Sequence, residues 1–248
     1  RSYAVGFSIG QKGYIGLGIN AKDFWEYDKV NNSWTQKATF TLINNIASAA
    51  AFSINGKGYV GTGNGGNGSF IWEYNPILDS WIQKNNFIGG TRVDIDRATF
   101  VIGSKAYWGG GVGFSDFWEY NPSNDLWTQM ADIPGGSERY GATGFSICNK
   151  GFLGLGNNDK DGIGALSDFW KYDPITNSWT AIAPFPGGRR LDAPSFVINN
   201  KAYVGTGSDN ANFYRDFWEY TPDFLPSLTI SGDTIITQGE TTSITASV

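Results

Sequence analysis

The stretch "DFWEYD", residues 23–28, indicates the fold of this chain because it recurs along the sequence. Aromatic residues beside carboxylates fit either a sugar-binding platform or an ordinary strand. The stretch returns as FIWEYN at 70–75, DFWEYN at 116–121, DFWKYD at 168–173 and DFWEYT at 216–221. Because five copies indicate one strand of a repeated unit, we interpret the repeated tryptophans as structural and reject the sugar platform for this stretch.

Two further features recur at fixed distances from this strand. A phenylalanine is followed five residues later by a lysine in every copy: Phe7 and Lys12, Phe52 and Lys57, Phe100 and Lys105, Phe145 and Lys150, Phe196 and Lys201. Four copies carry a second tryptophan nine residues after the first, namely Trp34, Trp81, Trp127 and Trp179. The period is about 48 residues with four short strands, which is typical of propeller blades.

The first copy defines the strands that we expect in every blade. Residues 4–9, 13–18, 23–28 and 33–37 are predicted to be successive antiparallel strands, with YNP or YDP turns between the last two in later copies. The lysine that opens the second strand should pair with a glutamate in the third: Lys12 with Glu26, Lys57 with Glu73, Lys105 with Glu119, Lys201 with Glu219. The fourth blade should break this rule, because Lys171 replaces the glutamate there.

Residues 1–222 resemble the kelch-repeat β-propellers, of the secreted or surface bacterial type, in these motifs. Glycines close the second strand, as in KGYIGLG at 12–18, and an aromatic third strand ends in YD or YN. The resemblance implies an all-β kelch-type β-propeller with five recognisable four-stranded blades. The fifth copy has Ser227 where the second tryptophan is expected. We therefore expect part of a six-bladed ring rather than a compact five-bladed one.

The composition changes after Pro222. Residues 223–248 contain no tryptophan and are rich in Thr, Ser and Ile, and short strands with turns are expected there. This segment resembles the start of an immunoglobulin-like module of bacterial surface proteins, so we interpret it as a linker and an incomplete immunoglobulin-like segment. The resemblance implies an extracellular or cell-surface location and adjacent domains of a larger chain.

The charge and composition argue against several classes of function. The net charge is −5, from 18 basic and 23 acidic residues, and no basic run is present, which argues against nucleic acid as a partner. No apolar run is long enough for membrane insertion. The chain contains no histidine, so copper, zinc and haem sites are not expected. The single cysteine, Cys148, is interpreted as a small buried residue at a strand end.

The loop between the second and third strands varies in length, whereas the turn between strands one and two is constant in all five copies and that between strands three and four is constant in four. From lysine to tryptophan the spacing is 13, 15, 13, 20 and 17 residues, so one face of the propeller is predicted to carry function. Its candidate ligand-binding residues are Arg92, Arg139, Tyr140, Arg190, Tyr214 and Arg215. Arginines after Gly-Gly turns fit an anionic ligand. The alternative, which we favour, is that the arginines before each first strand bond loop carbonyls.

The longest variable loop, 157–168, matches part of a calcium-binding pattern. Asn157, Asp159 and Asp161 alternate before Gly162, and Asp168 falls at the twelfth position, where such loops close with a carboxylate. Calcium is therefore the one cofactor that the sequence suggests. The alternative, which we favour, is a polar surface loop in which Asn and Asp cap turns.

We favour a non-enzymatic propeller that binds a glycan or a protein through its variable face. The alternative is a carbohydrate-active enzyme, similar to a sugar mutarotase or epimerase, that uses Arg and Asp/Glu on the same face, with Asp94, Asp96 and Glu138 as candidate acids. An intracellular adaptor is a third possibility, but no adaptor domain is present.

Overall fold

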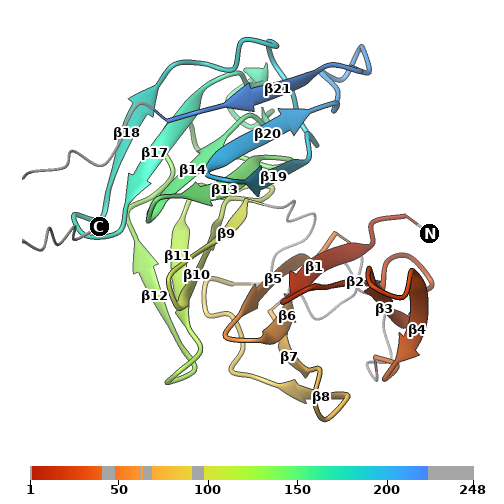
Figure 1. The fold of residues 1–248 in the computed structure, drawn as a ribbon. Coiled ribbons are helices and arrows are strands. Elements are labelled where there is room, and N and C mark those ends of the chain that lie inside the picture. The colour runs from red at the N-terminus through yellow and green to blue at the C-terminus, as the bar shows by residue number, and fades with distance from the viewer. Residues whose placement is uncertain (1, 41–47, 62, 64–68, 91–97, 223–248) are drawn as a thin grey trace, which may run out of the picture.

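The computed structural model describes residues 2–40, 48–61, 63, 69–90 and 98–222. The described residues are all-β and contain no helix, so none crosses a membrane as a helix. The structure is a β-propeller of five antiparallel blades, as the repeat predicts (Figure 1). Arg92, Asp94, Asp96 and the segment 223–248 lie outside the described residues.

Each blade is a sheet whose strands follow one another in sequence, from the centre of the molecule outwards. The first blade contains β1 (Val5–Ile9), β2 (Lys12–Gly16), β3 (Phe24–Asp28) and β4 (Ser33–Lys37). The second contains β5 (Ala50–Ile54), β6 (Lys57–Gly61), β7 (Ile71–Asn75) and β8 (Ser80–Gln83). The third contains β9 (Thr99–Ile102), β10 (Lys105–Gly109), β11 (Phe117–Asn121) and β12 (Leu126–Met130).

The last two blades depart slightly from this plan. The fourth contains β13 (Thr143–Ile147), β14 (Lys150–Gly154), β17 (Phe169–Asp173) and β18 (Ser178–Ile182), and its variable loop adds the hairpin of β15 (Asn157–Asn158) and β16 (Gly164–Ala165). The fifth has three described strands, β19 (Ser195–Ile198), β20 (Lys201–Gly205) and β21 (Phe217–Tyr220). The predicted strand positions and antiparallel pairing are therefore confirmed.

The first strands of the blades form the centre of the propeller. β1 packs on β5, β5 on β9, β9 on β13, and β13 on β19, while β4, β8, β12 and β18 lie at the periphery (Figure 1). Among the described residues no contact joins β19 to β1, so these five blades form an open arc. The opening leaves apolar side chains exposed on both end blades, including Trp34 at 54%, Phe196 at 46% and Phe217 at 50%.

The turn between the first two strands of each blade uses residues that tolerate a positive φ. Gly10 and Asn55 have φ of 59° and 51°, the left-handed conformation that tight hairpins require. Cys148 has φ of 49° in the fourth blade and is exposed, so the prediction that it is buried was wrong. The register of β13 and β14 places Cys148 in the turn itself, one residue beyond the strand end.

The aspartate of the DFW motif is a partner of the tryptophan two residues later. The indole Nε1 of Trp25 donates to Asp23 at 2.7 Å, and the same bond recurs in the third, fourth and fifth blades. The second blade has Phe70 in place of the aspartate, and Trp72 Nε1 has no partner among the described residues. The structural interpretation of the motif therefore accounts for its carboxylate as well as its aromatic residues.

Adjacent blades interlock through aromatic side chains. Phe24 of the first blade contacts Tyr74 and Trp81 of the second, with ring centroids 4.8 and 5.0 Å apart. A Cβ added at Gly58 would approach the ring of Phe7 to 2.3 Å, so only glycine permits this close packing. Because such contacts recur from blade to blade, the core lies between the sheets and is rich in aromatic residues.

Candidate functional site

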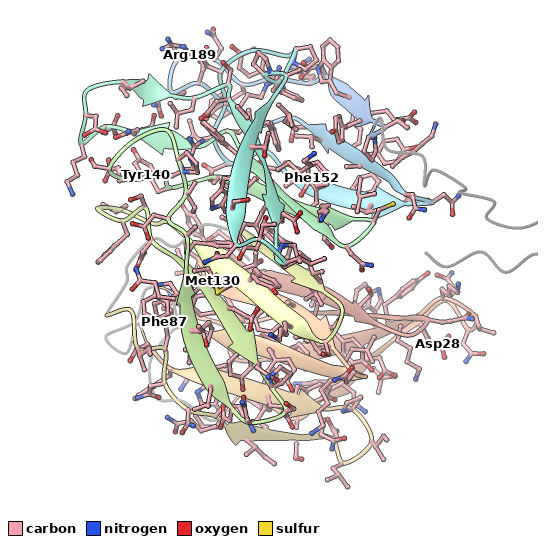
Figure 2. All side chains as sticks on the ribbon, turned by 90° about the vertical axis from the view of Figure 1, so that its left-hand side faces the viewer. Asp28, Phe87, Met130, Tyr140, Phe152 and Arg189 are labelled. Carbon is pink, nitrogen blue, oxygen red and sulfur yellow. The ribbon has the colours of Figure 1, made fainter. Side chains whose placement is uncertain are left out.

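The loops that vary in length gather on one side of the molecule. Figure 2 shows Tyr140 and Arg189 on this side and Asp28, at the end of β3, on the opposite side. Loops of the third and fourth blades meet at Glu138, in the connection between these blades, and its carboxylate accepts hydrogen bonds from the backbone N–H of Gly113 at 2.6 Å and Lys160 at 2.7 Å. Glu138 is 5% exposed, so it joins these loops and is not accessible as a general acid.

A cavity of about 270 Å³ lies at the centre of this face. The starts of all five first strands line it, largely with Ala, Gly and Val, and with the hydroxyl-bearing residues Thr99, Thr143 and Ser195. Thr143 donates to the carbonyl of Ala193 at 2.7 Å and Ser195 to that of Gly144 at 2.9 Å, so these hydroxyls also join the fourth and fifth blades. The size approaches the lower end of small-molecule sites, about 300 Å³.

Asp192 is an accessible carboxylate next to this cavity. It is exposed, and it directly precedes Ala193 and Pro194, which line the cavity. Its φ is 57°, and its backbone N–H donates to the carbonyl of Gly141 at 2.9 Å. Its carboxylate lies over Gly141, since a Cβ built there would be 3.2 Å from Oδ1.

The sequence analysis missed Asp192, although the repeat contains a signal for it. Asp192 stands four residues before Phe196, the position held by Tyr3, Ser48 and Gly141 in other blades. All four residues have positive φ, between 52° and 59°. The equivalent positions of the blades therefore surround the central cavity. The side chain at each of them contributes to the chemistry of the cavity entrance.

Tyr140 forms the second polar group of the face, two residues before the cavity-lining Ala142. Its hydroxyl donates to Asp159 Oδ2 at 2.5 Å and accepts a short hydrogen bond from Asn157 Nδ2. The pKa of Tyr140 is raised, mainly by burial and secondly by the hydrogen bond to Asp159. Asn157 is fully buried, whereas Asp159 is exposed, so Asp159 is the accessible carboxylate of this group.

Arg139 and Arg190 are structural residues in this arrangement. Arg139 is 2% exposed and donates to both oxygens of Asp168, at 2.8 and 2.7 Å, and to two loop carbonyls. Arg190 is fully buried and makes the same kind of contacts with Asp216 and two carbonyls. Burial and these partners keep both guanidinium groups from a ligand, in line with the structural alternative.

The other candidate residues have different environments. Tyr214 donates to Asp209 at 2.6 Å, and its ring stacks on Arg190 with the guanidinium carbon 4.0 Å from the centroid. Arg215 is exposed on the same loop as Tyr214. Arg189 is exposed on the connection between the fourth and fifth blades and donates to the carbonyl of Ile163. Only these two arginines of the described variable face are accessible to an anionic ligand.

The predicted calcium ligands do not converge in the structure. Asp161 accepts hydrogen bonds from Ser137 and Asn158, which lower its pKa to about 2. Asp168 is paired with Arg139, and Asp159 with Tyr140. Within the described residues, no group of three His, Cys, Asp or Glu side chains is placed to hold a metal ion. Asn157 is held in a strand pair with Ala165, which differs from a calcium-binding loop.

The fold and repeat define a β-propeller that carries a kelch motif, and the Kelch motif model matches residues 160–186. The chain is similar to two proteins named N-acetylneuraminate epimerase. That of Escherichia coli O9:H4 (strain HS) is 37% identical over 68 residues, 27% of this chain and 18% of the relative. That of Shigella flexneri serotype 5b (strain 8401) is 34% identical over 87 residues, 35% of this chain and 23% of the relative.

The similarity therefore spans about a fifth of the length of these curated relatives. The solved structure of YjhT has a TM-score of 0.72 and 16% identity, and the match covers 90% of this chain and 82% of that one, which supports the fold alone. Our preference for a non-enzymatic binding propeller was wrong, because the relatives are named as enzymes. The enzyme alternative agrees better with them.

Proposed function

We propose that this chain forms the propeller of a sugar epimerase that acts on an acidic amino sugar of the N-acetylneuraminate class. The observation that carries the proposal is the 34–37% identity with proteins named N-acetylneuraminate epimerase. The cavity at the centre of the variable face supports it, because its size is appropriate to a single sugar residue.

Acid–base chemistry in this chain has to use residues other than histidine. Inversion of a stereocentre requires one group to take a proton and another to return one. Among the described residues, the candidate groups are the carboxylate of Asp192, which directly precedes cavity residues, and the hydroxyl of Tyr140, which donates to Asp159 Oδ2. We assign Asp192 as the first candidate base, because its neighbours line the cavity, and Tyr140 with Asp159 as the candidate proton donor.

An acidic sugar also requires a cation to bind its carboxylate. Arg139 and Arg190 are buried, so among the arginines that the structure describes this role falls to the exposed Arg189 or Arg215. Both belong to loops of the variable face, and a guanidinium group binds a carboxylate in a bidentate manner. The extracellular location and the adjacent domains stay predictions from the sequence alone.

The test measures the rate at which the purified chain interconverts the epimers of N-acetylneuraminate. The rate is obtained from exchange between their NMR signals. We expect faster exchange than in buffer, reduced at least tenfold by Asp192→Asn and more weakly by Asp159→Asn. Asp132→Asn is the matched control, because Asp132 is an exposed aspartate that follows β12. Exchange at the buffer rate with folded protein and saturating sugar would overturn the proposal.

A further inference from the structure

Asn157 is a buried amide at a repeat position where the first and third blades have exposed apolar residues. It follows the second glycine of the Gly-x-Gly motif at the end of the second strand, and Ile19 and Val112 hold that position in those two blades. Both are exposed, whereas Asn157 is fully buried. The blade fold therefore does not require an amide there, and a buried amide needs a hydrogen-bond partner.

The backbone of Asn157 is held independently of its side chain. Its N–H donates to the carbonyl of Tyr140 at 2.8 Å, and its carbonyl accepts from the N–H of Tyr140 at 3.2 Å. On its other side Asn157 pairs with Ala165 in the β15–β16 hairpin. We therefore expect a substitution of the side chain to leave the loop in place.

The side chain of Asn157 contacts the hydroxyl of Tyr140, and the number of protons fixes the direction of this hydrogen bond. A tyrosine hydroxyl has one proton and two lone pairs. The proton is donated to Asp159 Oδ2 at 2.5 Å, because a carboxylate only accepts. The hydroxyl oxygen therefore accepts from Asn157 Nδ2, and Asn157 Oδ1 lies 3.5 Å from Nδ2 of Asn210.

These four residues form a chain of hydrogen bonds that all run in one direction, from Asn210 through Asn157 and Tyr140 to Asp159. Asn210, in the β20–β21 loop, and Asp159 are exposed, so the chain joins two variable loops and ends on an accessible carboxylate. Burial and the bond to Asp159 raise the pKa of Tyr140, and donation from Asn157 lowers it. A donor to the phenolic oxygen stabilises the charge that forms there when the proton leaves.

We propose that Asn157 is a positioning residue of the epimerase reaction and stabilises the oxygen of Tyr140 as the proton leaves it. This inference rests on the proposed function, in which Asp192 takes one proton from the sugar. The electron pair left on the sugar forms a bond to a proton given by Asp159. Asp159 regains a proton from Tyr140, and the electron pair of the broken O–H bond stays on the phenolic oxygen. Asn157 donates to that oxygen, as a donor of an oxyanion hole does.

Asn157→Leu tests the proposal, because it removes the donor with a side chain of similar size. We expect kcat for the interconversion of the N-acetylneuraminate epimers to fall by about 100-fold with KM nearly unchanged, since the donor is needed only when the proton leaves. Asn158→Leu is the matched control. Asn158 is the next residue and is equally buried, but it donates to Asp161, so its substitution should leave kcat close to that of the parent chain.

A double-mutant cycle separates this role from a structural one. In a Tyr140→Phe background, Asn157→Leu should cause no further loss of kcat, because the oxygen that Asn157 stabilises is absent. A loss of the same size in both backgrounds would show that Asn157 acts only on the loop, and it would overturn the proposal.

NMR of the side-chain amides tests the hydrogen bond without any sugar. The Nδ2–H signals of Asn157 are identified by their loss in Asn157→Leu, and they should shift in Tyr140→Phe while those of Asn158 stay. The absence of this shift contradicts the inference. A parent chain without epimerase activity overturns the proposed function and the inference with it. An active parent chain whose kcat is unaffected by Asn157→Leu overturns the inference alone.

Discussion

The ammonium group of Lys150 lies 2.7 Å from the carboxylate of Asp173, whereas the equivalent lysines of the other blades contact a glutamate two positions earlier in the third strand. The predicted pairs are confirmed at 2.5–2.6 Å, and the fourth blade breaks the rule as expected. There Lys171 replaces the glutamate, and Lys150 is the leading cause that lowers the pKa of Asp173.

The same replacement explains a second difference between the blades. In the first three blades and the fifth, a tyrosine of the second strand donates to this glutamate, as Tyr107 does to Glu119 at 2.6 Å. The fourth blade has the fully buried Phe152 at that position. A buried tyrosine hydroxyl in the fourth blade would have no glutamate to bind, because Lys171 holds that position. Phenylalanine at position 152 avoids this unpaired hydroxyl.

We predict that Tyr107→Phe lowers the free energy of unfolding by about 1.5–3 kcal/mol, the usual contribution of a hydrogen bond to a charged group. Tyr203→Phe in the fifth blade is the matched control, and we expect a smaller loss there because Tyr203 is more exposed. Urea unfolding measures both values. Equal losses at the two positions would contradict the role of burial.

Arg139→Lys is predicted to lower the free energy of unfolding by about 3–5 kcal/mol, because it breaks a buried bidentate pair and leaves loop carbonyls without donors. Arg189→Lys is the control, since Arg189 is exposed and should change stability by no more than about 0.5 kcal/mol. A stable Arg139→Lys protein with altered sugar binding would instead support the ligand-binding role.

Stability should fall in acid because of carboxylates such as Asp216. Hydrogen bonds from Arg190 are the main cause that lowers its pKa to about 2. A depressed pKa in the folded state contributes stability that is complete above the unfolded value, about 3.9, and is lost as the pH falls towards 2. The melting temperature measured from pH 6 to 2 should show this loss. The Asp216→Asn protein should have a lower melting temperature than the parent at pH 6. Its melting temperature should change less with pH below pH 4.

Calcium at millimolar concentration is predicted to produce no binding heat in chelator-treated protein, because Asp159, Asp161 and Asp168 each have a separate partner. Asp159→Ala and Asp161→Ala are the controls for the titration. Saturable heat that both substitutions abolish would restore the calcium site predicted from the sequence.

Local sequence patterns were sufficient to predict the strands of the blades and the ion pairs within them. The DFW motif, the lysine five residues after each phenylalanine and the turn residues act over a few positions, so their spacing specifies strands and neighbours directly. The candidate site was less predictable. Asp192 stands at a repeat position that holds Tyr3, Ser48 and Gly141 in other blades, and the importance of this position follows only from the cavity that the five blades form together.

The sequence by itself determined five repeated strand units, their antiparallel order and which residues face each other within a blade, because all of these follow from alternation and short turns. Only the tertiary structure decided which polar groups remain accessible. Arg139 and Asp159 look equally suitable as ligands in the sequence, yet packing buries one against Asp168 and leaves the other exposed. Accessibility depends on contacts between blades, and a spacing along the chain does not specify them.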